Sequence, residues 1–143
     1  MFSITTKIKE IMTTEVITVK PDDPMERVKE IFEHYSIHHV PVILHNKVVG
    51  IISREDYLKV IQGFSLFSNA KAADYNHALL RSLLVGEVMS AKVACLGPED
   101  TLLAAAGYFR ENLFHAIPII DANAELAGII TTYDLINYAY REE

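Results

Sequence analysis

The sequence contains a long internal repeat, and no other feature constrains the fold as strongly. Residues 11–43 align with residues 88–120 at a constant separation of 77 positions, from Met12 to Met89. After one additional residue in the second copy, residues 50–56 align with residues 128–134. Identical pairs include Met12 and Met89, Val16 and Val93, Pro21 and Pro98, Asp23 and Asp100, Phe32 and Phe109, His38 and His115, and Pro41 and Pro118. Because these matches keep one order, we infer a duplicated supersecondary unit.

Each copy begins with a predicted strand and a predicted helix. The β-branched runs at residues 16–19 and 93–96 predict strands that end before a proline and acidic residues. In the first copy, Asp23 as an N-cap and Pro24 in the first turn predict the start of a helix. Both helices carry an apolar stripe at helical spacing. The stripe comprises Met25, Val28, Ile31, Phe32 and Tyr35, and in the second copy Leu102, Ala105, Ala106, Phe109 and Leu113.

A predicted hairpin and a second helix complete each copy, which gives the element order β-α-β-β-α twice. The second strand of each hairpin has apolar residues on both faces, so we expect it to be buried. The closing helices are predicted to begin near Arg54 and Thr132. The predicted strand, turn and strand cover residues 41–44, 45–47 and 48–53 in the first copy, and residues 118–121, 122–125 and 126–131 in the second.

A segment with no counterpart in the repeat joins the two copies. Residues 63–69 have the composition of a loop, and residues 70–84 predict a helix with an apolar face of leucines. This helix either connects the repeats and packs on the core, or places Asn76, His77 or Arg81 in a ligand cleft. We divide the chain into a first repeat at 1–62, a connecting segment at 63–84 and a second repeat at 85–143.

Composition excludes several classes of protein. Half of the 143 residues are hydrophobic, so the chain can form a substantial core. The formal net charge of −6 and the absence of a lysine or arginine cluster argue against binding to nucleic acid or to anionic membranes. No apolar run approaches the ~20 residues that span a bilayer, no signal-peptide core is present, and Cys95 is the single cysteine. We expect a cytoplasmic protein.

The junction between the hairpin and the closing helix carries the chemistry of interest. In both copies a hydroxyl residue ends the strand and an aspartate follows three positions later: Ser53 and Asp56, then Thr131 and Asp134. The amides at a helix start can bind an anion, the hydroxyl can donate to phosphate, and the carboxylate can accept from two sugar hydroxyls. The same residues also fit a capping box, in which they only stabilise the helix start.

Taken together, these motifs resemble those of a CBS-domain pair, or Bateman module, over most of the chain from Lys9 to Tyr140. The resemblance rests on Met12 and Met89 and on the strings HHVPVI, HAIPII, GIISREDYL and GIITTYDLI. It implies an α+β fold in which two tandem β-α-β-β-α repeats pack with pseudo-two-fold symmetry. It also implies a regulatory protein that binds AMP, ADP, ATP or a related adenosyl ligand in two clefts between the copies, and that often forms a dimer.

Carried over by position, the resemblance assigns nucleotide-binding residues from both copies to each cleft. One cleft would contain Thr131 and Asp134 with Val16, Ile17, Ile37, His38 and His39. The other would contain Ser53, Arg54 and Asp56 with Val93, Ala94, Phe114, His115 and Ala116. In this assignment strand residues hold the adenine, aspartates hold the ribose, and hydroxyls, histidines and Arg54 hold phosphate. Since Thr132 replaces arginine in the second copy, we expect the two clefts to differ.

Other reactive side chains favour structural roles. His34 and His38 have the i, i+4 spacing of metal ligands, but Tyr35 and Ser36 are expected to end the helix between them, so we predict no metal site. Cys95 lies in a predicted strand without a basic neighbour, which favours a buried thiol over a nucleophile. No catalytic triad or phosphate-binding glycine loop is present, so we predict that the chain is not an enzyme and requires no cofactor.

The leading hypothesis is therefore a stand-alone regulatory module that binds adenine nucleotides and signals to an unknown protein partner. We expect a homodimer, because the closing helices at residues 56–61 and 135–139 carry more apolar surface than one unit can cover. The alternative hypothesis is a ligand-free module with a structural or protein-interaction role, in which both aspartates act only as helix caps.

Overall fold

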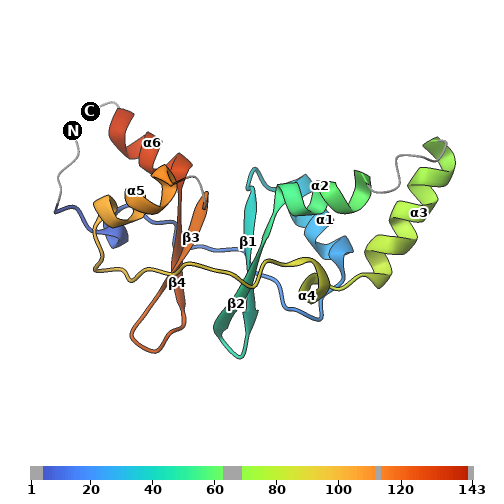
Figure 1. Ribbon diagram of the computed structural model, residues 1–143, viewed down its shortest axis with the longest axis horizontal. Helices are drawn as coiled ribbons and strands as arrows, with labels where there is room; N and C mark the ends of the chain where they lie inside the picture. The colour runs from blue at the N-terminus through green and yellow to red at the C-terminus, as the bar shows by residue number, and fades with distance from the viewer. Residues whose placement is uncertain (1–4, 63–68, 112–113, 142–143) are drawn as a thin grey trace. The chain divides into compact units, whose positions relative to one another are not determined.

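The structure of the chain, a computed structural model, describes residues 5–62, 69–111 and 114–141 (Figure 1). It contains both helices and short strand pairs, which confirms the predicted α+β class. The elements in chain order are the 3₁₀ helix η1 (Ile8–Glu10), α1 (Met25–His34), β1 (His39–Leu44), β2 (Lys47–Ser53), α2 (Arg54–Gln62), α3 (Asn69–Ser82), α4 (Val85–Val88), α5 (Leu102–Arg110), β3 (Ala116–Ile120), β4 (Leu126–Thr131) and α6 (Thr132–Tyr140).

The chain forms two compact units, and neither unit is a continuous stretch of sequence. Unit 1 comprises residues 1–16, 46–48 and 93–143, and unit 2 comprises residues 17–45 and 49–92. Unit 1 therefore contains most of the second repeat with the first residues of the first repeat, and unit 2 contains most of the first repeat with the connecting segment and the first residues of the second. These units reflect how the chain packs, and the division of the sequence at residues 62 and 84 stays a prediction.

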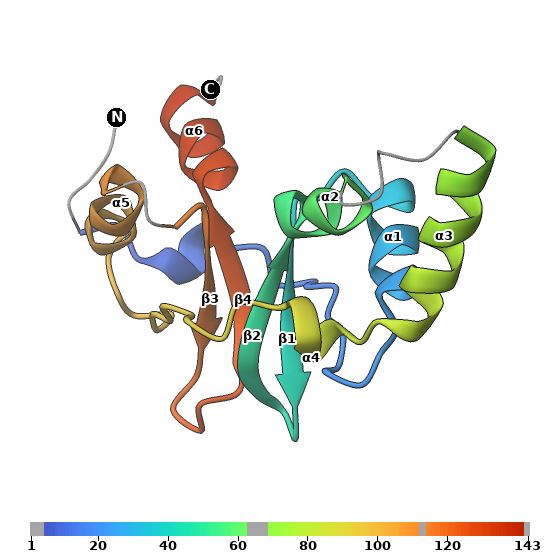
Figure 2. The same ribbon diagram turned by 45° about the vertical axis from the view of Figure 1, so that its right-hand side comes forward.

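Unit 2 is built on the hairpin of β1 and β2. His45 and Asn46 join the strands with positive φ angles of 51° and 64°, as a two-residue hairpin turn requires, which confirms the predicted turn. Figures 1 and 2 show α1 between this hairpin and α3. The buried core comprises Val19, Met25, Val28, Ile31, Phe32, Val40, Val42, Ile52, Leu80 and Val85. Of the stripe predicted for α1, Tyr35 is wrong, because it follows the last residue of this helix and is 53% exposed. Leu113, predicted for the stripe of the second copy, lies outside the described residues.

Unit 1 repeats this arrangement with β3 and β4. The strands pair antiparallel, with Ala116 opposite Thr131 and an irregularity between Ile119 and Ile120. The helices α5 and α6 contact one another, and Ile8 of η1 is completely buried with them. The buried core comprises Ile8, Leu102, Ala105, Ile117, Ile119 and Ile130.

The segments predicted as first strands are shorter than expected. In the described residues, 16–19 and 93–96 form no continuous strand; each makes one parallel bridge, Val19 to Val42 and Leu96 to Ile119. In unit 2, the bridge consists of hydrogen bonds from Val19 N to Pro41 O and from Ile43 N to Val19 O. The prediction of full strands was therefore wrong, because only the last residue of each run pairs with the hairpin.

The second strand of each hairpin also pairs with a segment that comes from outside its own repeat. We call these the exchanged segments, residues 6–16 in unit 1 and residues 83–92 in unit 2. In unit 1, Thr13 and Ile129 exchange two backbone hydrogen bonds of 2.9 Å. In unit 2, Ser90 and Ile51 exchange two of 3.0 Å. Thr13 and Ser90 occupy the same place in the repeat, so both copies use one interaction, in each case with the other copy's hairpin.

The exchanged segments also accept hydrogen bonds from the amides at the starts of α1 and α5. Met25 N at the start of α1 donates to Leu83 O (2.8 Å), and Leu102 N at the start of α5 donates to Thr6 O (2.9 Å). Asp23 is not the N-cap of α1, contrary to the prediction. Its carboxylate accepts from Lys20 N at 2.8 Å instead, and Pro24 takes the cap position without a side-chain bond.

A helix lies in the segment that joins the two repeats. The helix predicted at residues 70–84 is confirmed as α3, with Leu80 buried in the core of unit 2. The loop predicted before it lies mainly outside the described residues. Within the ranges that the structure describes, no helix is both long and apolar enough to cross a bilayer.

Two glycines permit the close approach of the exchanged segments, and their substitution tests this packing. A Cβ at Gly50 would lie 2.4 Å from Met89 Sδ, and one at Gly128 would lie 2.7 Å from Met12 Sδ and 2.8 Å from Thr13 O. We expect Gly50→Ala and Gly128→Ala each to lower the free energy of unfolding by ~1–3 kcal/mol, measured by urea denaturation.

The matched control is Gly107→Ala in α5, where a Cβ would meet no atom within 4 Å. This change should leave stability unchanged or raise it by up to ~1 kcal/mol, because alanine is the better helix former. Equal losses for all three variants would contradict the proposed close contact.

Candidate functional site

The candidate site in unit 2 lies where β2 ends and α2 begins. Ser53 N donates to Asp56 Oδ2 at 2.9 Å, and Asp56 N donates to Ser53 Oγ at 3.0 Å. This reciprocal pair is a capping box, with aspartate in the place where glutamate is more usual. Both side chains are half-buried.

The candidate site in unit 1 has the same arrangement at the start of α6. Thr131 N donates to Asp134 Oδ2 at 2.9 Å, and Asp134 N lies 3.2 Å from Thr131 Oγ1. In addition, the Thr131 hydroxyl donates to Asp134 Oδ2 at 3.1 Å. The capping interpretation of both motifs is therefore confirmed, while the ligand-binding interpretation stays a prediction.

The helix starts offer fewer amides to an anion than the sequence suggested. Arg54 N, the first amide of α2, donates to His38 O at 2.8 Å, and Thr132 N donates to His115 O at 3.3 Å. The third amide of each helix is used by the capping hydroxyl. Because two of the first three amides bond within the protein, phosphate binding here would depend mainly on side chains.

Several polar atoms at the two strand-to-helix junctions keep hydrogen-bonding capacity for a ligand. Among the described residues, Oδ1 of Asp56 and of Asp134 accepts no hydrogen bond, since both caps use Oδ2. The Ser53 hydroxyl accepts from Asp56 N and keeps its own hydrogen, whereas the Thr131 hydroxyl directs its hydrogen to Asp134. Arg54 is exposed at the first position of α2. The two junctions therefore differ in both hydroxyl and charge.

The remaining predicted site residues are placed as follows. Ile17 and Ile37 are partly buried against the core of unit 2, with His39 half-buried and His38 exposed. In unit 1, Val16, Val93 and Ala94 are half-buried, Ala116 is buried, His115 is exposed, and the Phe114 ring lies 5.9 Å from that of Tyr108. In unit 2 the structure brings His38 next to Arg54, and in unit 1 it brings His115 next to Thr132, each through a backbone hydrogen bond. The combination of strand residues from one copy with the junction of the other stays a prediction.

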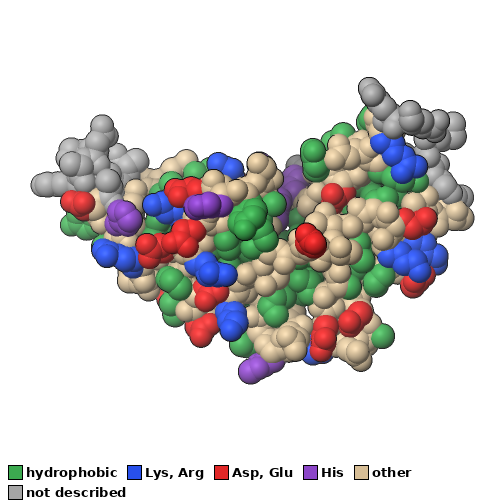
Figure 3. All heavy atoms as spheres, turned by 180° about the vertical axis from the view of Figure 1, so that it is seen from behind, with side chains coloured by type: hydrophobic (Ala, Val, Ile, Leu, Met, Phe, Trp, Pro, Cys, Tyr) green, Lys and Arg blue, Asp and Glu red, His purple; other side chains and the backbone are tan. Residues whose placement is uncertain are grey.

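The other reactive side chains make contacts that fit structural roles. Burial raises the pKa of the Cys95 thiol, which disfavours the nucleophilic thiolate. His34 is the last residue of α1, and its Nδ1 lies 2.8 Å from Glu30 O. In the described parts of the chain, no three His, Cys, Asp or Glu side chains are grouped as metal ligands. On the face seen in Figure 3, basic and acidic side chains are interspersed rather than gathered into one basic patch.

Comparison with known families identifies the architecture. The model of the CBS-domain family matches the chain twice, at residues 8–63 and 85–141. The chain belongs to the CBS-domain family. Both matches coincide with the two sequence repeats, which confirms the resemblance and the assignment of two tandem CBS repeats.

Individual relatives are similar over nearly the whole chain. Inosine-5'-monophosphate dehydrogenase from Korarchaeum cryptofilum is 27% identical over 136 residues, which are 95% of this chain but 24% of that enzyme. The chain spans less than half the length of the first curated relatives that it matches. Similarity to a dehydrogenase is therefore confined to its CBS part and shows no catalytic activity for this chain.

Two solved structures share the CBS fold. CBSX2 in complex with AMP, a protein of Arabidopsis thaliana, has a TM-score of 0.74 and 23% identity, covering 94% of this chain and 96% of CBSX2. The CBS domain pair of protein MJ0100, in complex with 5'-methylthioadenosine and S-adenosyl-L-methionine, has a TM-score of 0.73 and 23% identity, covering 94% and 96%. At this level of identity, the similarity shows that the fold is shared.

Removal of either aspartate tests the capping role. We expect Asp56→Ala and Asp134→Ala each to lower the free energy of unfolding by ~0.5–2 kcal/mol, because the carboxylate that accepts a hydrogen bond from the Ser53 or Thr131 amide is lost. Urea denaturation measures this change. Glu55→Ala is the control, since Glu55 is exposed and makes a 3.5 Å ion pair with Lys59 that should contribute less than ~0.5 kcal/mol. If the aspartate variants were as stable as the control, the caps would contribute nothing measurable.

Proposed function

We propose that this chain is a regulatory CBS module that binds an adenosine-containing ligand such as AMP, ADP or ATP at its two strand-to-helix junctions. The observation that carries the proposal is the duplicated aspartate, which caps its helix through Oδ2 and retains Oδ1 for a ligand. A ribose presents two vicinal hydroxyls, and both can donate to such a carboxylate. Relatives with the same fold that bind AMP or S-adenosyl-L-methionine support this ligand class.

The proposal keeps the residue sets that the family resemblance predicts. Asp56 and Asp134 hold the ribose, and partly buried residues such as Ile17 and Val93 provide apolar contacts for the adenine. In this proposal, Ser53 and Arg54 bind phosphate at one junction, and Thr131 and a histidine bind it at the other. Because only the first junction carries a guanidinium, which is a strong bidentate donor to phosphate, the two sites are expected to differ in phosphate binding.

Signalling is proposed to pass through the closing helices to a homodimer. In α6, Tyr133, Ile136 and Tyr140 are 69%, 59% and 83% exposed at i, i+3 and i+7 spacing, so one face of the helix is apolar and uncovered within the chain. Asp134 lies in the first turn of this helix. A ligand on Asp134 would therefore act directly on the element that carries the proposed dimer surface, and would favour one dimer geometry over another.

The second candidate function is a module without a ligand, which has a structural or protein-interaction role. The observation that favours it is the complete capping box at both junctions, because a cap alone accounts for the hydroxyl and the aspartate. The two candidates differ in one outcome. Only the first requires that conservative changes of the aspartates alter ligand binding.

Calorimetric titration with AMP, ADP, ATP and adenosine tests the nucleotide proposal. We expect at least one phosphorylated ligand to bind below millimolar concentration, and Asp56→Asn or Asp134→Asn to weaken its site by ~10-fold or more, because a charged acceptor for ribose is lost. Glu55→Gln, an exposed neighbour of Asp56, should leave binding unchanged. Failure of all four ligands to bind would exclude sensing of these nucleotides and leave the ligand-free candidate.

Light scattering at micromolar concentration tests the dimer. We expect the mass of a dimer for the natural chain and of a monomer for Ile136→Glu, because a buried charge in an apolar interface is costly. Leu103→Glu is a matched control, since Leu103 on α5 is 57% exposed and Ile136 is 59% exposed. A natural chain that is monomeric, or a dimer unaffected by Ile136→Glu, would contradict the assignment of this surface.

A further inference from the structure

The two closing helices expose different side chains, although they occupy the same place in the repeat. In α6 the exposed positions are Tyr133, Ile136, Asn137 and Tyr140, and none of them is charged. Asp134, which caps the helix, is the single charged residue of α6. An uncharged face with two tyrosines and an isoleucine stays in contact with water unless a second molecule covers it.

The corresponding face of α2 is polar and charged. At the three positions that match the apolar residues of α6, the sequence has Glu55, Leu58 and Gln62. Glu55 and Lys59 are both exposed and form an ion pair of 3.5 Å. Arg54 adds another exposed charge at the start of the helix. This face is well hydrated as it stands, and covering it with another molecule would take charges out of water.

This difference decides which surface of a second copy can cover α6. If α2 of the second copy packed on α6, its ions would lose water and gain no opposite charge, because the exposed face of α6 has none. The α6 helix of the second copy offers the same uncharged face instead. Since each copy carries a net charge of −6, contact through an uncharged surface also limits repulsion between them. A surface that pairs with itself closes after two copies.

The first turn of α6 connects the candidate ligand site to the exposed face. Leu135 and Tyr138 pack against the core of unit 1 and anchor the helix. Its first turn is fixed by the cap, in which Thr131 N donates to Asp134 at 2.9 Å and Asp134 N lies 3.2 Å from Thr131 Oγ1. Tyr133 lies in the same turn and is 69% exposed. A ligand that binds Asp134 therefore acts on the turn that carries Tyr133.

We propose that two copies pair through α6 alone, and that only the junction of Thr131 and Asp134 is coupled to this pairing. A ligand at that junction shifts the equilibrium between monomer and dimer, whereas a ligand at Ser53 and Asp56 does not. By reciprocity, the coupled site binds its ligand with different affinities in monomer and dimer, and the other site binds equally in both. This assignment of regulation to one site rests on the proposed function.

Engineered cysteines in the full chain test the pairing of α6 without any ligand. Ile136 is the middle residue of the exposed face, so the two copies of Ile136 are expected to meet near the two-fold axis. With Cys95 removed by Cys95→Ala, we expect Ile136→Cys to form a disulfide-linked dimer with oxidised glutathione. Leu58→Cys, at the corresponding exposed position of α2, should remain a monomer on a non-reducing gel. Equal cross-linking of both variants, or none in Ile136→Cys, overturns the pairing.

Analytical ultracentrifugation of the full chain with AMP and with adenosine tests the coupling. We expect a ligand that binds by calorimetry to change the Kd of the dimer by ~5-fold or more. The change should persist in Asp56→Asn and disappear in Asp134→Asn. The opposite result for the two variants, or a bound ligand that leaves the Kd of the dimer unchanged, overturns the coupling and leaves the proposed function intact.

Failure of the proposed function gives a different result. If neither ligand binds by calorimetry, nucleotide binding fails and the coupling fails with it. The cysteine variants then still decide whether α6 forms the interface, because their cross-linking requires no ligand.

Discussion

The backbone pairing of each hairpin with the first residues of the other repeat is the interaction on which the rest of the structure depends. Ile51 pairs with Ser90 and Ile129 pairs with Thr13, each through two hydrogen bonds. Both pairings occur two residues before a strand ends in the capping hydroxyl. They therefore hold the end of the strand in place, and with it the first turn of the closing helix. Gly50 and Gly128 permit this arrangement, since any side chain there would overlap a methionine.

Most of the local structure could be predicted from the sequence because it is encoded locally. The turn at His45 and Asn46, the hairpins and the closing helices follow from short patterns that fix their own conformation. The exchange of segments could not be predicted in this way. Thr13 and Ser90 occupy equivalent positions near the start of the two repeats, so either hairpin offers each of them the same partner, and only the three-dimensional packing distinguishes the two pairings.

Errors in the prediction arose where a residue had two possible partners. Asp23 has the sequence context of an N-cap, but its carboxylate bonds to Lys20 N, and the carbonyl of Leu83 from the exchanged segment accepts from Met25 N instead. The residues at 16–19 have strand propensity but only one of them meets the hairpin. Local propensity identified the run of β-branched residues but could not show that only its last residue has a neighbouring strand.

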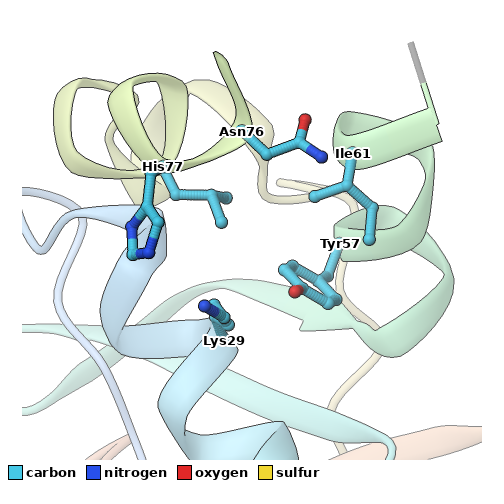
Figure 4. Close-up of a pocket in the computed structure, with 6 residues that line it drawn as sticks. Lys29, Tyr57, Ile61, Asn76 and His77 are labelled. Carbon is cyan, nitrogen blue, oxygen red and sulfur yellow. The ribbon is translucent and has the colours of Figure 1, made fainter. Parts of the chain in front are cut away.

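The candidate sites also contain hydrogen bonds that could not be predicted from the sequence pattern. The aspartates and hydroxyls were found because they recur in both copies, yet the pattern did not reveal that His38 O and His115 O use the first amide of each closing helix. The sequence offered Asn76, His77 or Arg81 as residues of a ligand cleft, as the alternative to a packed connecting helix. In unit 2, Asn76 and His77 line a small pocket between α1, α2 and α3 (Figure 4), whereas Arg81 does not, and its Nε donates to His77 O.

The exchange of segments is tested most directly by nuclear Overhauser contacts of the methionine methyl groups. The structure predicts contacts from the Met12 methyl to the α-protons of Gly128 and from the Met89 methyl to those of Gly50. Assigned spectra of the full chain with labelled methionine methyl groups would report both pairs. Contacts from Met12 to Gly50 and from Met89 to Gly128 would instead show that each hairpin pairs with the beginning of its own repeat, and would contradict this account.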